Sequence, residues 1–155
     1  MFSMSTVRAE AAHDIDARPS AVYAVLADYR VGHPAILPKP YFTDLKVQAG
    51  GRGAGTVIQV TMQVLGVERV YHEVVSEPEP GRVLAETDAD AGVTTTFTVD
   101  ALDGGKRSRV TIATEARTSP GLRGVVERMV QPPLLRGIYR KELRQLEEYI
   151  KETTV

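Results

Sequence analysis

Histidine is the side chain that changes charge most readily near neutral pH, and this chain has three of them, His13, His33 and His72. They lie far apart in the sequence and match none of the helical or short-loop spacings from which zinc sites are built. Cysteine is absent, which excludes disulfides, thiolate catalysis and cysteine-based metal sites. We therefore expect no metal and no cofactor.

Acid–base chemistry would need a histidine, tyrosine or carboxylate inside a cavity, where burial shifts its pKa. His33 lies in an irregular segment before Pro34. Tyr71 and His72 are neighbours on an expected strand, so one points inward and the other outward. Valines share the parity of both residues, and the pattern leaves the choice open. The candidate catalytic residues are His33, Tyr71 and His72, and further possibilities are Tyr29, Tyr41 and Glu68.

Other catalytic and phosphate-binding patterns find no support. No serine lies in a Gly-x-Ser-x-Gly elbow. The glycine-rich segment 50–55 is followed by a strand pattern, with no Lys-Ser/Thr, so we interpret it as a tight turn that needs positive φ values. Segment 88–92 is interpreted as a hairpin turn, because Val99 stands where a calcium loop needs a bidentate glutamate.

The elements that would position these residues are mostly strands. Val7–Ile15 alternates weakly, and Pro19 suits the first turn of a following helix. Three prolines within 34–40 prevent a long element there. Six further strands, separated by turn signals, are predicted at 42–48, 56–65, 67–76, 82–87, 93–101 and 107–117. Their short connections favour an antiparallel meander.

The last third of the chain, from about Ser119 to Lys151, has the spacing of one long amphipathic helix. Ser119 suits the N-cap, and Pro120 suits the first helical position. Pro132-Pro133 removes two backbone donors, so we expect a kink or two nearly collinear helices. In the kinked case, the residues before the break would face a pocket and those after it would pack on the sheet edge.

Composition places the chain in one globular domain spanning 1–155, with residues 1–6 as a disordered tail. Of its 155 residues, 43% are hydrophobic and 25% are charged, which is enough for a substantial core. The net charge of −1 offers no positive excess for nucleic-acid binding. Neither a signal peptide nor a membrane-spanning run is visible, so we expect a cytoplasmic protein without integral membrane association.

Three features together resemble the helix-grip fold of the START/pollen-allergen (SRPBCC) superfamily, in particular its polyketide cyclase/dehydrase-like branch. They are the segment from Ile15 to Asp28, which resembles a first strand running into a helix through I-x-A-x-P-x-x-V, the glycine-rich segment 50–55, and the terminal helix. Many relatives carry a tryptophan where this chain offers Tyr29 and His33. The resemblance implies an α+β fold. A curved seven-stranded antiparallel sheet would wrap around the C-terminal helix, with two short helices after the first strand.

Such a fold implies a cavity between the sheet and the terminal helix, and cavities of this kind are mostly apolar. Our leading hypothesis is binding of an apolar or aromatic small molecule, lipid-like or polyketide-like. The expected lining residues are Tyr29, His33, Leu37, Met62, Tyr71, Phe97, Val126, Met129, Val130, Leu134 and Ile138. The resemblance also allows an aromatase/cyclase- or dehydratase-like enzyme that uses a cavity histidine or tyrosine. A third alternative is an interaction module or homodimer with a filled cavity.

Overall fold

The computed structural model describes residues 6–118 and 121–153, with residues 122–130 described by their backbone alone. Residues 1–5 of the expected tail, and the expected cap Ser119-Pro120, lie outside the described residues, and Thr6 already belongs to the first strand. In chain order, the elements are β1 Thr6–Ile15, α1 Pro19–Ala27, α2 Gly32–Ile36, β2 Phe42–Ala49, β3 Val57–Val64, β4 Val67–Glu79, β5 Val83–Asp88, β6 Val93–Leu102, a 3-10 turn η1 Asp103–Gly105, β7 Arg107–Arg117 and α3 Leu122–Thr153.

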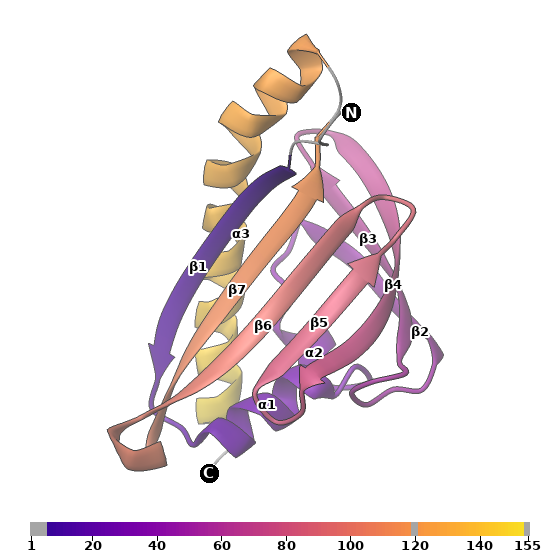
Figure 1. Ribbon diagram of the computed structural model, residues 1–155. Helices are drawn as coiled ribbons and strands as arrows, with labels where there is room; N and C mark the ends of the chain where they lie inside the picture. Colours follow the sequence, from indigo (N-terminus) through magenta and orange to yellow (C-terminus); the bar gives the residue numbers. More distant parts are fainter. Residues whose placement is uncertain (1–5, 119–120, 154–155) are drawn as a thin grey trace.

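The strands form one antiparallel sheet in the order β1-β7-β6-β5-β4-β3-β2. β2 to β7 are a meander, as the short connections predict, and β1 returns to pair with β7. Figure 1 shows the sheet curving around α3, with α1 and α2 at the end where α3 finishes. This is the helix-grip arrangement that the resemblance implies.

α3 is a single helix that continues through both prolines, so of the two expected alternatives, a kinked helix or two nearly collinear helices, the second is excluded. The positions that follow Pro133 pack as a helical stripe into the core, with Ile138, Leu143 and Leu146 almost completely buried. α3 contacts β1 and α2, and tertiary packing of an apolar face offsets the backbone donors lost at proline. The first turns project past the end of β1 (Figure 1). None of the described helices has the length and apolar character required to cross a membrane.

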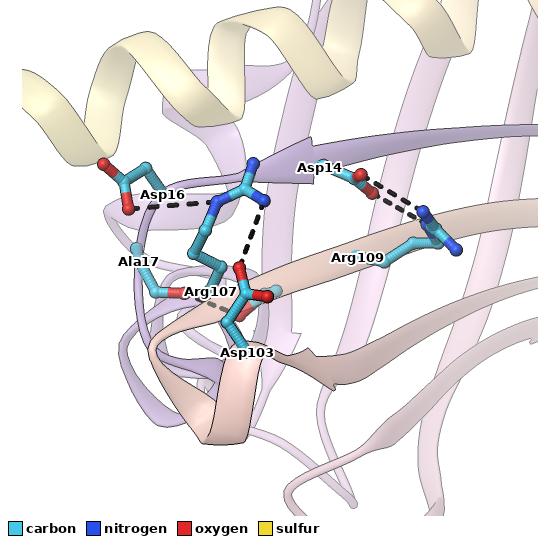
Figure 2. A network of polar contacts seen from close by, with 7 residues as sticks. Asp14, Asp16, Ala17, Asp103, Arg107 and Arg109 are labelled. Atoms are coloured by element: carbon cyan, nitrogen blue, oxygen red, sulfur yellow. Dashed lines mark hydrogen bonds and ion pairs between the residues drawn. The ribbon is translucent and has the colours of Figure 1, made fainter.

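A polar network joins β1, β7 and η1 at the end of the sheet near α1 (Figure 1 and Figure 2). Arg109 binds Asp14 on the neighbouring strand with both ends of its guanidinium, at 2.7 and 3.1 Å. Arg107 reaches Asp103 at 3.4 Å and Asp16 at 4.0 Å. The buried Ser108 hydroxyl donates to the carbonyl of Ala17 at 2.7 Å. These contacts fix the chain as it leaves β1 for α1.

The glycine-rich segment is a turn whose backbone is bonded within the protein, as the sequence predicts. Gly50, Gly51, Gly53 and Gly55 have positive φ. The amide of Gly53 donates to Ala27 O, and the carbonyl of Gly51 accepts from the amide of Tyr29, both at 2.9 Å. The segment therefore holds the end of α1 and orients Tyr29 toward the interior.

Candidate functional site

A cavity of about 400 Å³ lies between α3 and the sheet. Its walls come from β3, β4, β6, β7 and the middle of α3. The lining residues are Met62, Val64, Leu65, Val67, Arg69, Tyr71, Glu73, Val93, Thr95, Thr114, Ala116, Gln131, Leu134, Leu135 and Tyr139. Leu65 (78% exposed), Val67 and Arg69 are exposed, so the β3–β4 turn forms the mouth of the cavity. Gln131, Leu134, Leu135 and Tyr139 line it on the helix side, so α3 faces the cavity on both sides of the two prolines.

Three hydroxyl groups form a chain across one wall of the cavity. Thr95 of β6 and Thr114 of β7 are paired in register, and their hydroxyls lie 2.7 Å apart. The Thr114 hydroxyl is also hydrogen-bonded to the Tyr139 hydroxyl of α3. This chain joins the helix to the sheet and gives the otherwise apolar wall a hydrogen-bonding strip.

The buried end of the site holds three glutamates, which we call the carboxyl cluster: Glu73 of β4, Glu86 of β5 and Glu142 of α3. Glu73 lines the cavity and shares a hydrogen bond with Glu86. Glu142 is 2% exposed, and its charge acts on Glu73 and Glu86. Within the described part of the chain, the buried Oε2 atoms of Glu73 and Glu142 have no hydrogen-bond partner. Unpartnered buried carboxyl oxygens are costly, because they lose hydration without compensation.

Burial favours the protonated form of all three carboxyls, and repulsion between them adds to this effect at Glu73 and Glu142. Burial, followed by the charge of Glu86, raises the pKa of Glu73 to about 9. Burial also raises the pKa of Glu86 to about 7, although hydrogen bonds from Tyr29 and Glu73 oppose that shift. The pKa of Glu142 is raised well above its usual value by burial and by the two neighbouring carboxyls. The cavity floor is therefore mostly uncharged and proton-rich at neutral pH.

His33 lies behind the cluster in an aromatic sandwich. Its ring stacks on Tyr29 with centroids 4.5 Å apart and meets the edge of Phe97 at 5.3 Å. Nδ1 is 2.7 Å from the carbonyl oxygen of Leu26, and because that oxygen can only accept, Nδ1 carries the proton. Burial lowers the pKa of His33 to about 4, so the ring is neutral at pH 7. Tyr29 and His33 thus pack together in the interior beside Phe97.

Glu86 joins this sandwich to the cavity. Its Oε2 accepts from the Tyr29 hydroxyl at 2.6 Å and lies 3.3 Å from Nε2 of His33. With Nδ1 protonated, Nε2 of the neutral ring is an acceptor, and a protonated Glu86 can donate to it. A hydrogen-bonded path therefore runs from His33 through Glu86 to Glu73 at the cavity wall.

The residues that the sequence singled out fall into four groups. Met62, Tyr71 and Leu134 line the cavity. Tyr29, His33, Phe97 and Ile138 are buried outside its wall, and Leu37 is half-buried away from it. Val126, Met129 and Val130 lie in the part of α3 whose side chains are not described. Tyr71 faces the cavity and His72 is exposed on the opposite face, which resolves the choice left open by the alternation of β4.

The sequence did not predict the carboxyl cluster. Glu68 was the only glutamate among the candidate acid–base residues. Glu142 offered a signal, since it lies three positions after Tyr139 and four after Ile138 on the apolar stripe of the helix. Glu86 follows Leu84 at strand spacing and shares its inward face. Among the described residues, no three histidine, aspartate or glutamate side chains are arranged to hold a metal ion.

Comparisons with solved structures find many chains of the same fold. KanY, solved in solution by NMR, is 29% identical with a TM-score of 0.81, over 96% of this chain and 99% of that one. The Zhui aromatase/cyclase from Streptomyces sp. R1128 is 16% identical with a TM-score of 0.76, over 97% of both chains. Norcoclaurine synthase from Thalictrum flavum, in complex with dopamine and hydroxybenzaldehyde, is 16% identical with a TM-score of 0.70, over 99% of this chain and 91% of that one.

A search of curated proteins gives no significant match. The family described as polyketide cyclase / dehydrase and lipid transport matches residues 6–151, which is almost the whole chain and includes every described element of the cavity. The aromatase/cyclase and norcoclaurine synthase neighbours share the helix-grip architecture. The chain therefore belongs to the polyketide cyclase/dehydrase and lipid transport family of the SRPBCC superfamily.

Proposed function

We propose that this protein binds an apolar or aromatic small molecule, lipid-like or polyketide-like, between the sheet and α3. The observation that carries the proposal is the cavity of about 400 Å³, which is open at the β3–β4 turn. A volume of this order accommodates a small organic ligand. The walls combine aliphatic side chains with a strip of threonine and tyrosine hydroxyls, which can orient a ligand.

Membership of the family supports the proposal in a general way, since its description covers both cyclase or dehydrase activity and lipid transport. A filled core would favour the third alternative, an interaction module, but the space beside Leu134 and Leu135 remains open. The proposed occupant lies with its apolar body against these leucines and Met62. Its polar group lies toward Thr95, Thr114 and Glu73.

The test is titration with the neutral fluorescent probe N-phenyl-1-naphthylamine. Wild type should bind one probe per chain with saturation. Ala116→Phe places a ring in the cavity and should weaken binding at least tenfold, because Ala116 is part of the lining. Ala113→Phe is the matched control, since it lies three positions away on β7 and points to the opposite face. Equal binding by both variants would refute the cavity as the site.

A second candidate function, a cyclase- or dehydratase-like enzyme, is supported by one observation. Glu73 presents a carboxyl to the cavity and holds its proton at neutral pH, because burial and Glu86 raise its pKa. Such a group is a competent general acid for a carbonyl or hydroxyl oxygen of a bound ligand. Tyr71, a catalytic candidate from the sequence, also lies in the cavity wall, whereas His72 is turned away from it.

The enzyme hypothesis is tested with 4-hydroxy-4-(2-naphthyl)butan-2-one, which loses water to give a conjugated ketone with a new absorbance band. If Glu73 is the acid, wild type accelerates this reaction. Glu73→Gln should then lower kcat at least 100-fold and leave KM within a few-fold. Absence of turnover by wild type, or full turnover by Glu73→Gln, would argue for binding alone.

A further inference from the structure

The carboxyl cluster contains more carboxyl oxygens than the described cations and hydrogen-bond donors of the protein pair with. Three carboxyls lie near one another in the interior. Among the described residues of the cavity wall, Arg69 is the only cation. Arg69 is exposed at the mouth and contacts Tyr71, so it does not balance Glu142. A buried carboxyl is normally paired with a cation or fully hydrogen-bonded. Two buried Oε2 atoms in the cluster meet neither condition within the described residues.

Two independent observations indicate that the missing partner comes from outside the chain. The cavity reaches the cluster directly, because Glu73 is part of its wall. Behind Glu73, Glu142 of α3 is almost fully buried beside Glu73 and Glu86, and within the described residues its Oε2 has no hydrogen-bond partner. This acidic cluster differs from one on the protein surface, because it closes the inner end of an open and mostly apolar cavity.

We propose that the ligand of this cavity is an organic amine, whose protonated nitrogen lies against Glu73 while its apolar body lies beside Met62 and Leu134. This inference rests on the proposed binding function and names the class of ligand. The ammonium group would donate to Glu73 Oε2, which would be ionised in the complex, with Glu86 and Glu142 behind it. Charge-assisted hydrogen bonds of this kind are stronger than neutral ones and strengthen further in a dry site.

Proton exchange must accompany such binding. The cluster is mostly protonated when empty, so an arriving ammonium group displaces one carboxyl proton to solvent, and net charge is conserved. The titratable and charged groups that face the cluster come from every element around it. They are Tyr29 and His33 near α2, Tyr71 of β4, Asp88 of β5, and Tyr139 of α3, while Arg69 of β4 interacts with Tyr71.

Three probes of one shape separate this proposal from plain apolar binding. They are 2-naphthylmethylamine, which is a cation at neutral pH, the neutral 2-naphthylmethanol, and the anion 2-naphthoate. At pH 8 the amine should bind at least about tenfold more tightly than the alcohol, and the naphthoate most weakly. An alcohol that equals the amine would overturn the amine proposal, and tightest binding of naphthoate would assign the ligand to Arg69 instead.

The glutamate variant localises the preference. Glu73→Gln keeps shape and hydrogen bonding, so the alcohol should bind as in wild type while the advantage of the amine falls to within about twofold. Glu68→Gln removes an exposed carboxyl from the same strand and should leave all three affinities unchanged. An amine advantage that survives Glu73→Gln would refute the assigned contact.

Isothermal titration in two buffers of different ionisation enthalpy tests the proton exchange on wild type alone. Amine binding at pH 7.5 should release between about half a proton and one proton per ligand, and alcohol binding should release none. No release with the amine would overturn the proposal. Other outcomes would refute the proposed binding function itself, and not only the amine preference. They are no binding of any probe by wild type, or binding of all probes by Ala116→Phe as tightly as by wild type.

Discussion

At the scale of single residues, the site depends on carboxyls that look like surface residues in the sequence. β4 shows why they were missed. Its inward parity contains Arg69, Tyr71 and Glu73, while Val70 and Val74 on the outward parity are 45% and 54% exposed. Apolar alternation orients a strand only when the apolar residues face the core. On β4 valines stand on both faces, since Val67 lines the cavity and Val75 is buried, so no inference from hydrophobicity could have placed Glu73 in the cavity.

The raised pKa of Glu73 predicts a stability that falls with rising pH. The folded carboxyl titrates at about 9, while the unfolded one titrates near 4.5. Below pH 4.5 both states hold the proton, and between the two values only the folded state does. The free energy of unfolding therefore decreases as pH rises from about 5 to 9. Glu73→Gln removes this contribution, and its Tm relative to wild type should rise by about 2 °C or more between pH 5 and pH 8.

The control for that experiment is Glu68→Gln, which removes an exposed carboxyl from the same strand. Its Tm difference from wild type should stay constant over the same pH range. Thermal unfolding followed by circular dichroism measures both variants. A Glu73→Gln difference that is also independent of pH would mean that Glu73 is ionised in the folded protein.

His33 carries the second residue-scale prediction. Its pKa is lowered to about 4 by burial, so the unfolded chain takes up a proton at this residue below pH 6.5 and the folded chain does not. His33 therefore costs stability progressively as pH falls from about 6.5 to 4. NMR of the imidazole nitrogens should show the neutral form with a proton on Nδ1 down to about pH 5. A charged ring at pH 6 would contradict the arrangement with Leu26 and Glu86.

At the scale of elements, the sequence predicts the strands well because turns and alternation are local signals. Gly66 and the Asp103-Gly104-Gly105 turn stand where the chain reverses, and six of the seven strands follow as a meander. The prolines of α3 were harder to interpret. Two missing donors suggested a kink or two nearly collinear helices, and because the apolar stripe continues across them, its packing keeps one helix.

Pro133 therefore offers an element-scale prediction. It is exposed inside α3, and Pro133→Ala restores a backbone donor, so Tm should rise by a few degrees. If the proline region opens the cavity, the probe should also dissociate more slowly. Gly137→Ala is the control, since its added Cβ meets open space, and it should stabilise by about 0.5–1 kcal/mol. Equal dissociation rates in wild type and both variants would make the prolines a structural feature only.

The network of Figure 2 provides a contrast between a buried and an exposed contact. Ser108→Ala leaves the Ala17 carbonyl without its buried donor and should lower the free energy of unfolding by about 1–2 kcal/mol. Asp14→Asn breaks the exposed ion pair with Arg109 and should have much less effect. Urea denaturation of the two variants measures the difference. A larger loss in Asp14→Asn would show that the surface pair, not the buried hydroxyl, holds β1 to β7.

At the scale of the whole molecule, the cavity arises because the curved sheet and α3 do not fill the space between them. The resemblance implies such a hollow, but its position depends on side chains far apart in sequence. Ala116 leaves room at β7, Leu134 and Leu135 close one side, and Glu73 closes the inner end. Five separate elements define this volume, and no local sequence pattern reports it. The sequence therefore predicts the helix-grip fold but not how the lining residues are arranged around the cavity.

The central claim is that this volume is a ligand site, and NMR of the methyl groups tests it most directly. We predict that adding N-phenyl-1-naphthylamine shifts the methyl signals of Met62, Val64, Leu134 and Leu135 with saturation at one probe per chain, while those of the exposed Val70 and Val74 stay in place. Shifts confined to Val70 and Val74, or shifts that grow without saturation, would contradict the account.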